Sequence, residues 1–480
     1  MIMSRDENIV RNGNIRTGNL SFEEVEKFKY LGATVTNIND TREEIKHRIN
    51  MGNAYYYSIE KLLSSSLLSK NVKVRIYKTV ILPVVLYGCE TWTFTLREKH
   101  RLRVFENKYS ALDTSPLSIY VMHPFWNRVV EWCPKWVAPN LLTFAGFLFT
   151  VLNFLMFSYY DYDFYASSDE HPEVPAIPRW VWAVAALNIF LAYTLDGIDG
   201  KQARRTQTSG PLGELFDHGL DSWTAFLIPT CMYSVFGRGV HSISPLRMYF
   251  CLWNIFVNFY LSHWEKYNTG VLFLPWGYDA SMVAAILIFV VTSIFGHRAW
   301  AFNLPGGMSA GHMFELTFYI CAIVSNLPMC LWNVYKSYRD GTGKMRPFSE
   351  AMRPLIPVII FLVVCTVWVM YSPVDVVDLD PRCVYLVTGT IFSNICCRLI
   401  VSQMSSTRCE LFNWMIIPAG LVVAVSLILP SSTGAYAELS MLYALALFAT
   451  VAHIHYGSCV VRQMCRHFRI SCFRIRQHGE

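Results

Sequence analysis

Apolar stretches long enough to cross a lipid bilayer recur from Leu141 onward, and they restrict the fold more than any other feature. They lie roughly at 141–160, 179–195, 222–236, 247–263, 280–296, 313–335, 354–371, 382–403, 411–429 and 438–455. Because unpaired backbone groups are costly in lipid, segments of this kind should be helices. Several are slightly short of the roughly 20 residues that span a bilayer untilted. The sequence predicts an all-α, polytopic membrane bundle of about ten transmembrane helices with a small soluble N-terminal segment.

Composition supports this prediction and divides the chain in two. With 53% hydrophobic and only 16% charged residues, the chain is too apolar for ordinary soluble domains. Its net charge of +6 lies entirely in residues 1–108, which hold 18 Lys and Arg and 12 Asp and Glu, whereas the remainder holds 23 of each. We therefore predict two parts, residues 1–108 and 109–480, and expect no nucleic-acid partner for the second. The 14 cysteines form no CxxC pair, which disfavours a disulfide framework or a zinc site.

Charges between the apolar stretches predict an orientation, since Lys and Arg near membrane spans collect on the cytosolic side. The loops at 161–178, 372–381 and 430–440 are poor in Lys and Arg, so we expect them to be lumenal. Basic residues gather at 201–205, at 336–353 and in the segment from 462 onward, which should be cytosolic. Arg238 and Arg247 oppose the rule, because they lie in a loop predicted to be lumenal.

Four carboxylates follow the second apolar stretch, where residues 195–222 read LDGIDGKQARRTQTSGPLGELFDHGLDS. Asp196 and Asp199 share one face of a helix, and Asp217 and Asp221 share a face of the next. If those faces pack together, four like charges meet in a medium of low dielectric and cannot all stay ionised without cations. Carboxylate oxygens suit Mg²⁺ or Mn²⁺, which also bind substrate phosphates. The spacing predicts a metal site with these four aspartates as ligands.

Small and basic residues around the aspartates indicate a phosphate-bearing ligand. Gly200, Ala203 and Gly213 place little side chain between the backbone and a nucleotide diphosphate. Arg204 and Lys201 would neutralise phosphate charge. The same basic residues, together with Arg205, would equally suit an anionic lipid surface.

The spacing of these residues matches the signature D-x2-D-G-x2-A-R-x8-G-x3-D-x3-D of the CDP-alcohol phosphotransferases, which the chain resembles. The segments YSALDTSPLSIYVMHPFW from Tyr109, VAPNLLTF from Val137, LSHWEKYNTGVLFLPWGYD from Leu261 and SQMSSTRC from Ser402 look like animal ethanolaminephosphotransferases. The resemblance covers about residues 108–469. It implies two metal ions held by the aspartates and CDP bound by the first motif helix. It also implies transfer from CDP-ethanolamine to diacylglycerol, giving phosphatidylethanolamine and CMP, in an endoplasmic reticulum or Golgi membrane with the site facing the cytosol.

The reaction needs a base for the lipid hydroxyl, and His218 and Asp221 are the candidates. An imidazole exchanges protons near neutral pH, whereas a metal-bound carboxylate is a weak base. His218 would also fit as a polar neighbour of the aspartates.

Head-group choice is open at this stage. Glu265 is a candidate partner for the ammonium of ethanolamine, although a structural ion pair of Glu265 with Lys266 or with an arginine fits as well. Cholinephosphotransferase activity or dual specificity is therefore the alternative, and a membrane transporter is the alternative from a different class, because intramembrane charges also mark ion paths. A homodimer stays open.

The N-terminal segment has a resemblance of its own. FKYLGATVTNINDTREEIKHRINMGNAYYY, KTVILPVVLYGCETWT and REKHRLRVFENK look like the region after the polymerase core in non-LTR retrotransposon reverse transcriptases. Since the segment has no YxDD-type carboxylates, we expect residues 1–108 to be a non-functional fragment, and residues 109–480 to be the enzyme domain.

Overall fold

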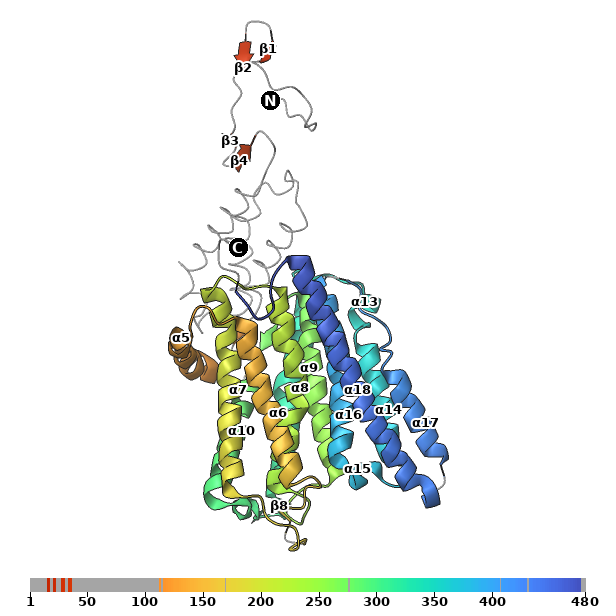
Figure 1. Cartoon of the computed structure of the whole chain (residues 1–480). Helices are drawn as coiled ribbons and strands as arrows, with labels where there is room; N and C mark the ends of the chain where they lie inside the picture. Colours follow the sequence, from red (N-terminus) through yellow and green to blue (C-terminus); the bar gives the residue numbers. More distant parts are fainter. Residues whose placement is uncertain are drawn as a thin grey trace. The chain divides into compact units, whose positions relative to one another are not determined.

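The computed structural model describes residues 115–475, apart from 169, 275–276, 406 and 430, and short strands outside that range (Figure 1). The chain divides into two units, Met1–Tyr109 and Ser110–Glu480. In the first unit, β1 (Ile15–Thr17) pairs with β2 (Leu20–Phe22), and β3 (Lys27–Tyr30) pairs with β4 (Ala33–Thr36), both antiparallel. The predicted retrotransposon-like fragment otherwise lies outside the described residues.

The second unit is built almost entirely from helices. Its first half contains a π-helical turn η3 (Ser118–Met122), α5 (His123–Trp132), α6 (Pro139–Tyr160), α7 (Arg179–Arg205), α8 (Pro211–Phe236), α9 (Pro245–Thr269) and α10 (Gly277–Phe295). Its second half contains a 3-10 turn η4 (His297–Trp300), α11 (Ala310–Ile320), η5 (Cys321–Asn326), α12 (Leu327–Arg339), α13 (Phe348–Met352), α14 (Leu355–Tyr371), α15 (Val376–Leu379), α16 (Pro381–Ser405), α17 (Ile416–Ile428) and α18 (Ser431–Phe468).

Strands are minor in the second unit. A parallel pair joins β5 (Leu112–Asp113) to β6 (Phe273–Leu274), and an antiparallel pair joins β7 (Asn303–Leu304) to β8 (Met308–Ser309). The predicted all-α membrane bundle is thus confirmed for the described part of the chain.

Each predicted apolar stretch falls on a helix, although the boundaries differ. Six helical spans among the described residues are long and apolar enough to cross a membrane: Pro139–Tyr160, Arg179–Arg205, Gly277–Phe295, Ala310–Arg339, Pro381–Ser405 and Ala435–Phe468. Helices α14 and α17 are apolar but shorter. The number of helices that cross the membrane, about ten, stays a prediction.

Proline and glycine set several of the helix ends. Helices α6, α8 and α9 each begin with proline in the first turn, where its missing N–H would have no partner in the helix anyway. Helix α9 ends at Gly270, whose φ of 77° is a left-handed conformation that glycine adopts without steric cost. Because proline favours the first turn, α8 begins at Pro211, well before the apolar stretch predicted from 222.

Small residues allow close packing at the centre of the bundle. A Cβ on Gly146 of α6 would lie 3.2 Å from the carbonyl oxygen of Ala192 on α7. A Cβ on Gly389 of α16 would lie 2.2 Å from the ring of Phe226 on α8. Such approaches are the usual basis of helix association in lipid, where apolar surface alone does not drive helices together. They bring α6, α7, α8 and α16 side by side (Figure 1).

A buried arginine joins three segments at the end of the bundle where α6 and α8 finish. Arg382, in the first turn of α16, is 1% exposed. Its guanidinium group donates to the backbone oxygens of Asp161 at 2.6 Å and Tyr162 at 2.9 Å, and to the hydroxyl of Ser234 at 3.3 Å. It also lies 4.1 Å from the ring centre of Phe164.

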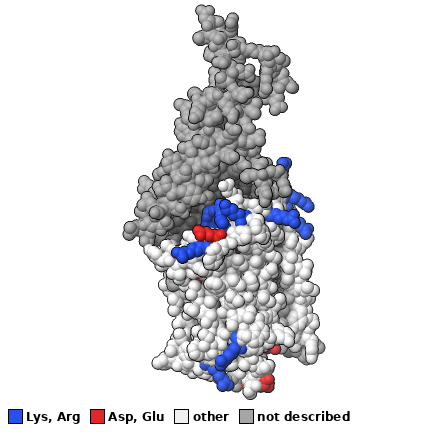
Figure 2. All heavy atoms as spheres, turned by 60° about the vertical axis from the view of Figure 1, so that its left-hand side comes forward, with Lys and Arg blue, Asp and Glu red and all other residues white. Residues whose placement is uncertain are grey.

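Charged side chains gather at the two ends of the bundle on the face shown in Figure 2, with uncharged surface between them. The loops around Asp161 and Asp380 meet at one end, where Tyr162 donates to Asp380 at 3.1 Å. The two basic residues that oppose the orientation rule are paired with carboxylates, Arg238 with Asp378 and Arg247 with Glu315. Their charges are therefore balanced within the protein.

Candidate functional site

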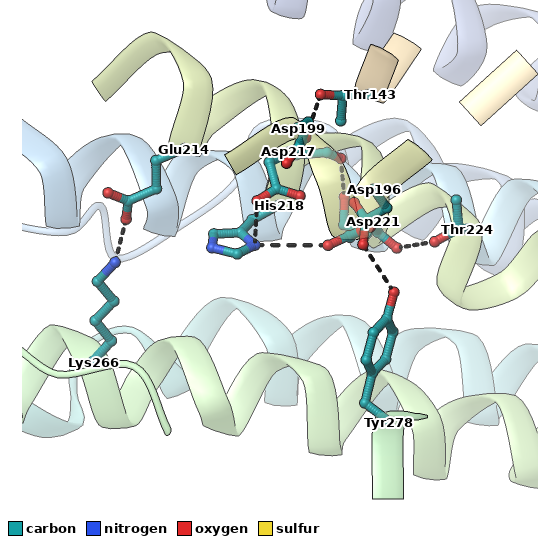
Figure 3. A network of polar contacts seen from close by, with 12 residues as sticks. Thr143, Asp196, Asp199, Glu214, Asp217, His218, Asp221, Thr224, Lys266 and Tyr278 are labelled. Atoms are coloured by element: carbon teal, nitrogen blue, oxygen red, sulfur yellow. Dashed lines mark hydrogen bonds and ion pairs between the residues drawn. The ribbon is translucent and has the colours of Figure 1, made fainter. Parts of the chain in front are cut away.

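The four motif aspartates converge where α7 and α8 pass on either side of α6. Helix α7 continues beyond its apolar part to Arg205, so Asp196 and Asp199 stay on a regular helix. Helix α8 begins at Pro211 and presents Asp217 and Asp221 one and a half to three turns later. Both helices pack against α6, and their carboxylates point toward one another (Figure 3). The predicted convergence is seen in the structure.

The carboxylates form two overlapping groups. Asp196, Asp199 and Asp217 offer ligand atoms that all lie within 4.8 Å of one another, and so do Asp217, His218 and Asp221. Asp217 belongs to both groups. The three carboxylates of the first group fit one divalent cation, and Asp217 and Asp221 of the second group fit another that shares Asp217.

Two hydroxyl groups orient the carboxylates from neighbouring helices. Thr143 of α6 donates to Oδ2 of Asp199 at 2.5 Å, and Tyr278 of α10 donates to Oδ2 of Asp196 at 3.2 Å. Asp199 is buried. These hydrogen bonds fix the directions of the two carboxylates. Carboxylates crowded in an apolar bundle repel one another, and bound cations would balance their charge.

His218 lies between the second pair of aspartates, as Figure 3 shows. Its Nδ1 is 3.7 Å from Asp217 Oδ2 and 3.6 Å from Asp221 Oδ2. The imidazole ring of buried His263, on α9, lies edge-on at 5.2 Å between ring centres. This arrangement holds the His218 ring beside the carboxylates.

An ion pair that links α8 to α9 lies one turn before His218. Lys266 of α9 is bound to Glu214 of α8 (Figure 3). Glu265 is buried on the same helix.

The residues predicted to shape a CDP pocket lie near the same end of the bundle. Arg204 is exposed, and its Nη1 lies 3.6 Å from the position that a Cβ on Gly200 would take. A Cβ on Gly213 would lie 3.6 Å from Oδ1 of Asn140 on α6. Ala203 is half-buried. The guanidinium group of Arg204 therefore lies directly beside the backbone of Gly200.

Other side chains on this stretch hold α5 instead. Lys201 donates to Asn127 at 2.8 Å, and Arg205 donates to the backbone oxygens of Val130 and Cys133, both at 2.6 Å. Because helix C-termini leave carbonyl oxygens without partners, Arg205 caps α5. The structure thus assigns Lys201 and Arg205 contacts within the protein, which the sequence analysis did not foresee.

A cavity extends from the carboxylates toward the apolar middle of the bundle. Its volume is about 30 Å³, and it lies between α6, α7, α8 and α10. Asp196 and Asp221 lie at its polar end, and Phe147, Ile228 and Met282 are among its apolar lining. The same space therefore meets both the carboxylates and a lipid-like surface.

Several members of this site were not expected from the sequence: Thr143, Tyr278, Glu214 and His263, and the pairing of Lys266 with Glu214. Thr143 and Tyr278 lie 56 and 82 residues from the aspartates that they contact. The only signal was indirect, since both fall within the segments VAPNLLTF and LPWGYD that carried the resemblance.

Comparison with known proteins agrees with this geometry. The family model described as CDP-alcohol phosphatidyltransferase matches residues 136–305, a range that includes all four aspartates. The mouse and human proteins named Ethanolaminephosphotransferase 1 are each 49% identical over 370 residues, which is 77% of this chain and 92% of theirs. Choline/ethanolaminephosphotransferase 1 of Arabidopsis thaliana is 30% identical over 391 residues, 77% of this chain and 95% of that protein. The chain therefore belongs to the CDP-alcohol phosphatidyltransferase family.

Proposed function

We propose that this protein is an ethanolaminephosphotransferase, which moves phosphoethanolamine from CDP-ethanolamine to diacylglycerol and releases CMP. The observation that carries the proposal is the pair of overlapping carboxylate groups on α7 and α8, at the polar end of a cavity with an apolar lining. The names of the mouse and human relatives support ethanolamine as the head group.

Asp196, Asp199 and Asp217 would hold one divalent ion, and Asp217 and Asp221 would hold a second. Mg²⁺ or Mn²⁺ in these positions supplies Lewis-acid stabilisation of the charge that develops on the diphosphate. Thr143 and Tyr278 keep the carboxylates of Asp199 and Asp196 in the directions that binding requires. Arg204, Gly200, Ala203 and Gly213 form the surface that receives the CDP moiety, with Lys201 at its edge.

His218 is our choice for the base, in preference to Asp221. Because Nδ1 of His218 faces the two carboxylates, Nε2 is the nitrogen available to the lipid hydroxyl. The hydroxyl proton moves to this nitrogen as the oxygen bonds to the β-phosphorus. The bond from that phosphorus to the bridging oxygen breaks, and the electron pair leaves with CMP. The apolar side chains of Phe147 and Met282, which line the cavity, would face the lipid part of the acceptor.

Choline transfer, alone or with ethanolamine transfer, is the second candidate. It is favoured by the Arabidopsis relative, whose name gives both head groups. Membership of a transferase family argues against a transporter function.

The decisive experiment measures CMP release by the purified protein in vesicles that contain diacylglycerol. CDP-ethanolamine and CDP-choline are supplied in parallel, each with Mg²⁺, with Mn²⁺ and with EDTA. We expect metal-dependent release that is faster with CDP-ethanolamine. Absence of metal-dependent turnover with either donor would contradict the proposed function, whereas faster turnover of CDP-choline would move the assignment to the second candidate.

Two variants test the roles of the site residues. Asp221→Asn and His218→Ala should each lower kcat about 100-fold or more, since one removes a metal ligand and the other the base. Asp375→Asn and His171→Ala are matched controls, because both residues lie at the opposite end of the bundle. Full activity in either test variant would remove that residue from its role.

We place the enzyme in an endoplasmic reticulum or Golgi membrane with the carboxylate site facing the cytosol. Lys and Arg cluster at 201–205, at 336–353 and from 462 onward, and this clustering supports the orientation. A homodimer stays a prediction.

A further inference from the structure

The chain turns back across the end of the bundle after α18 (Figure 1). The turn occurs at Arg469, whose φ is 54°. The N–H of Ile470 donates to the backbone oxygen of Cys465 at 3.1 Å, which closes the last turn of the helix. Residues 470–475, which we call the strap, then continue over the helices that carry the site.

The strap contacts α6 and α8 at the same time. The backbone oxygen of Cys472 accepts a hydrogen bond from Nδ2 of Asn140, on α6, at 3.1 Å. The ring of Phe473 lies 5.8 Å from Phe144 of α6 and 5.6 Å from Phe216 of α8. Phe144 and Phe216 are themselves 6.1 Å apart, so the three rings form one cluster.

The residues of α6 and α8 that the strap contacts lie beside members of the carboxylate site or one helical turn away from them. Phe216 directly precedes Asp217 in α8, and Phe144 directly follows Thr143, which donates to Asp199. Asn140 lies one turn earlier on α6, and its Oδ1 faces Gly213 of α8. A shift of α8 relative to α6 would therefore move Asp217 relative to Thr143, the α6 residue that holds Asp199 of α7.

The site needs such support because it lies near the beginning of α8. Asp217 comes only six residues after the first residue of that helix, Pro211. Helix ends open more readily than helix middles, since they make fewer backbone hydrogen bonds. A third segment that packs on both helices restricts this motion.

We propose that the strap is a positioning element of the active site, and that Phe473 is its principal positioning residue. It holds α6 and α8 at the separation that lets Asp199 and Asp217 bind one cation together. The inference rests on the proposed function.

The test compares Phe473→Ala, Phe473→Tyr and Ile470→Ala in the full chain. Ile470 is the matched control, because it is 41% exposed and Phe473 is 42% exposed in the same segment. CMP release is measured against the concentrations of Mn²⁺ and of CDP-ethanolamine, and the thermal unfolding midpoint of each variant is recorded. If Phe473→Ala yields no folded protein, Phe473→Leu is measured by the same criteria.

We expect Phe473→Ala to raise the Mn²⁺ concentration for half-maximal activity about tenfold, as is typical when support for metal ligands is lost. Phe473→Tyr, which keeps the ring, and Ile470→Ala should behave like the wild type. An unchanged Mn²⁺ requirement in Phe473→Ala would overturn the proposal, and so would a lowered unfolding midpoint with unchanged kinetics. A wild-type protein with no turnover would instead contradict the proposed function.

Discussion

Asp217 has a different position from the other three aspartates, because it belongs to both carboxylate groups. Its direction depends on α8, whereas Asp199 is held from α6 through the hydroxyl of Thr143. The spacing of the aspartates along the chain predicted their convergence, since it places each pair on one helical face. It could not predict Thr143 or Tyr278, because a contact between helices depends on how those helices pack.

Thr143→Val tests the contribution of this orienting hydroxyl. Valine has nearly the same shape but cannot donate to Asp199, so we expect kcat/KM to fall about tenfold and the Mn²⁺ requirement to rise. The measurement is CMP release against Mn²⁺ concentration.

Thr317→Val is the control for that substitution. Thr317 lies on α11 and donates to Met313 of its own helix. Kinetics in Thr143→Val that match those of Thr317→Val would show that the hydrogen bond to Asp199 has no functional role.

At the scale of elements, the indole of Trp126 on α5 fits against the motif stretch of α7 at Gly197. A Cβ on Gly197 would lie 2.1 Å from the indole of Trp126, so this glycine has a packing role although the motif leaves its position variable. The sequence predicted where the apolar helices lie because hydropathy marks them. It did not predict α5, or the start of α8 at Pro211, because these segments are amphipathic or polar.

Gly197→Ala should destabilise the protein by about 1–3 kcal/mol, because the indole must move out of a packed position. The thermal unfolding midpoint measures this, and Gly420→Ala is the control, since a Cβ there meets nothing within 4 Å. Adding Trp126→Leu to Gly197→Ala should cost less than the sum of the two single changes. Additive losses would show that the ring and the glycine are not coupled.

At the scale of the molecule, the bundle separates two sets of loops. The basic segments predicted to be cytosolic lie at the carboxylate end, where the N–H of Lys344 donates to the backbone oxygen of Asn268 in the last turn of α9. The loops predicted to be lumenal meet at the other end around Asp380. Arg238 and Arg247 are exceptions to the rule that counts Lys and Arg, and the sequence does not reveal their pairing with Asp378 and Glu315.

The orientation can be tested with an epitope inserted at one of two exposed positions, Glu173 or Gly341. In sealed microsomes, an antibody should reach the epitope at Gly341 without detergent and the epitope at Glu173 only after detergent. Retained CMP release identifies correctly folded variants. The reverse pattern of access would place the carboxylate site in the lumen.

Arg382 has a consequence for how the protein is made. The groups that accept hydrogen bonds from its guanidinium belong to the segment after α6 and to α8, and both precede α16 in the chain. A ribosome therefore delivers the acceptors to the translocation machinery before it delivers the arginine. The guanidinium group therefore has hydrogen-bond acceptors available when α16 enters the bundle, and an unpaired charge in the lipid would be costly. The order of synthesis thus suits the stepwise assembly of the bundle, with α16 docking after its neighbours.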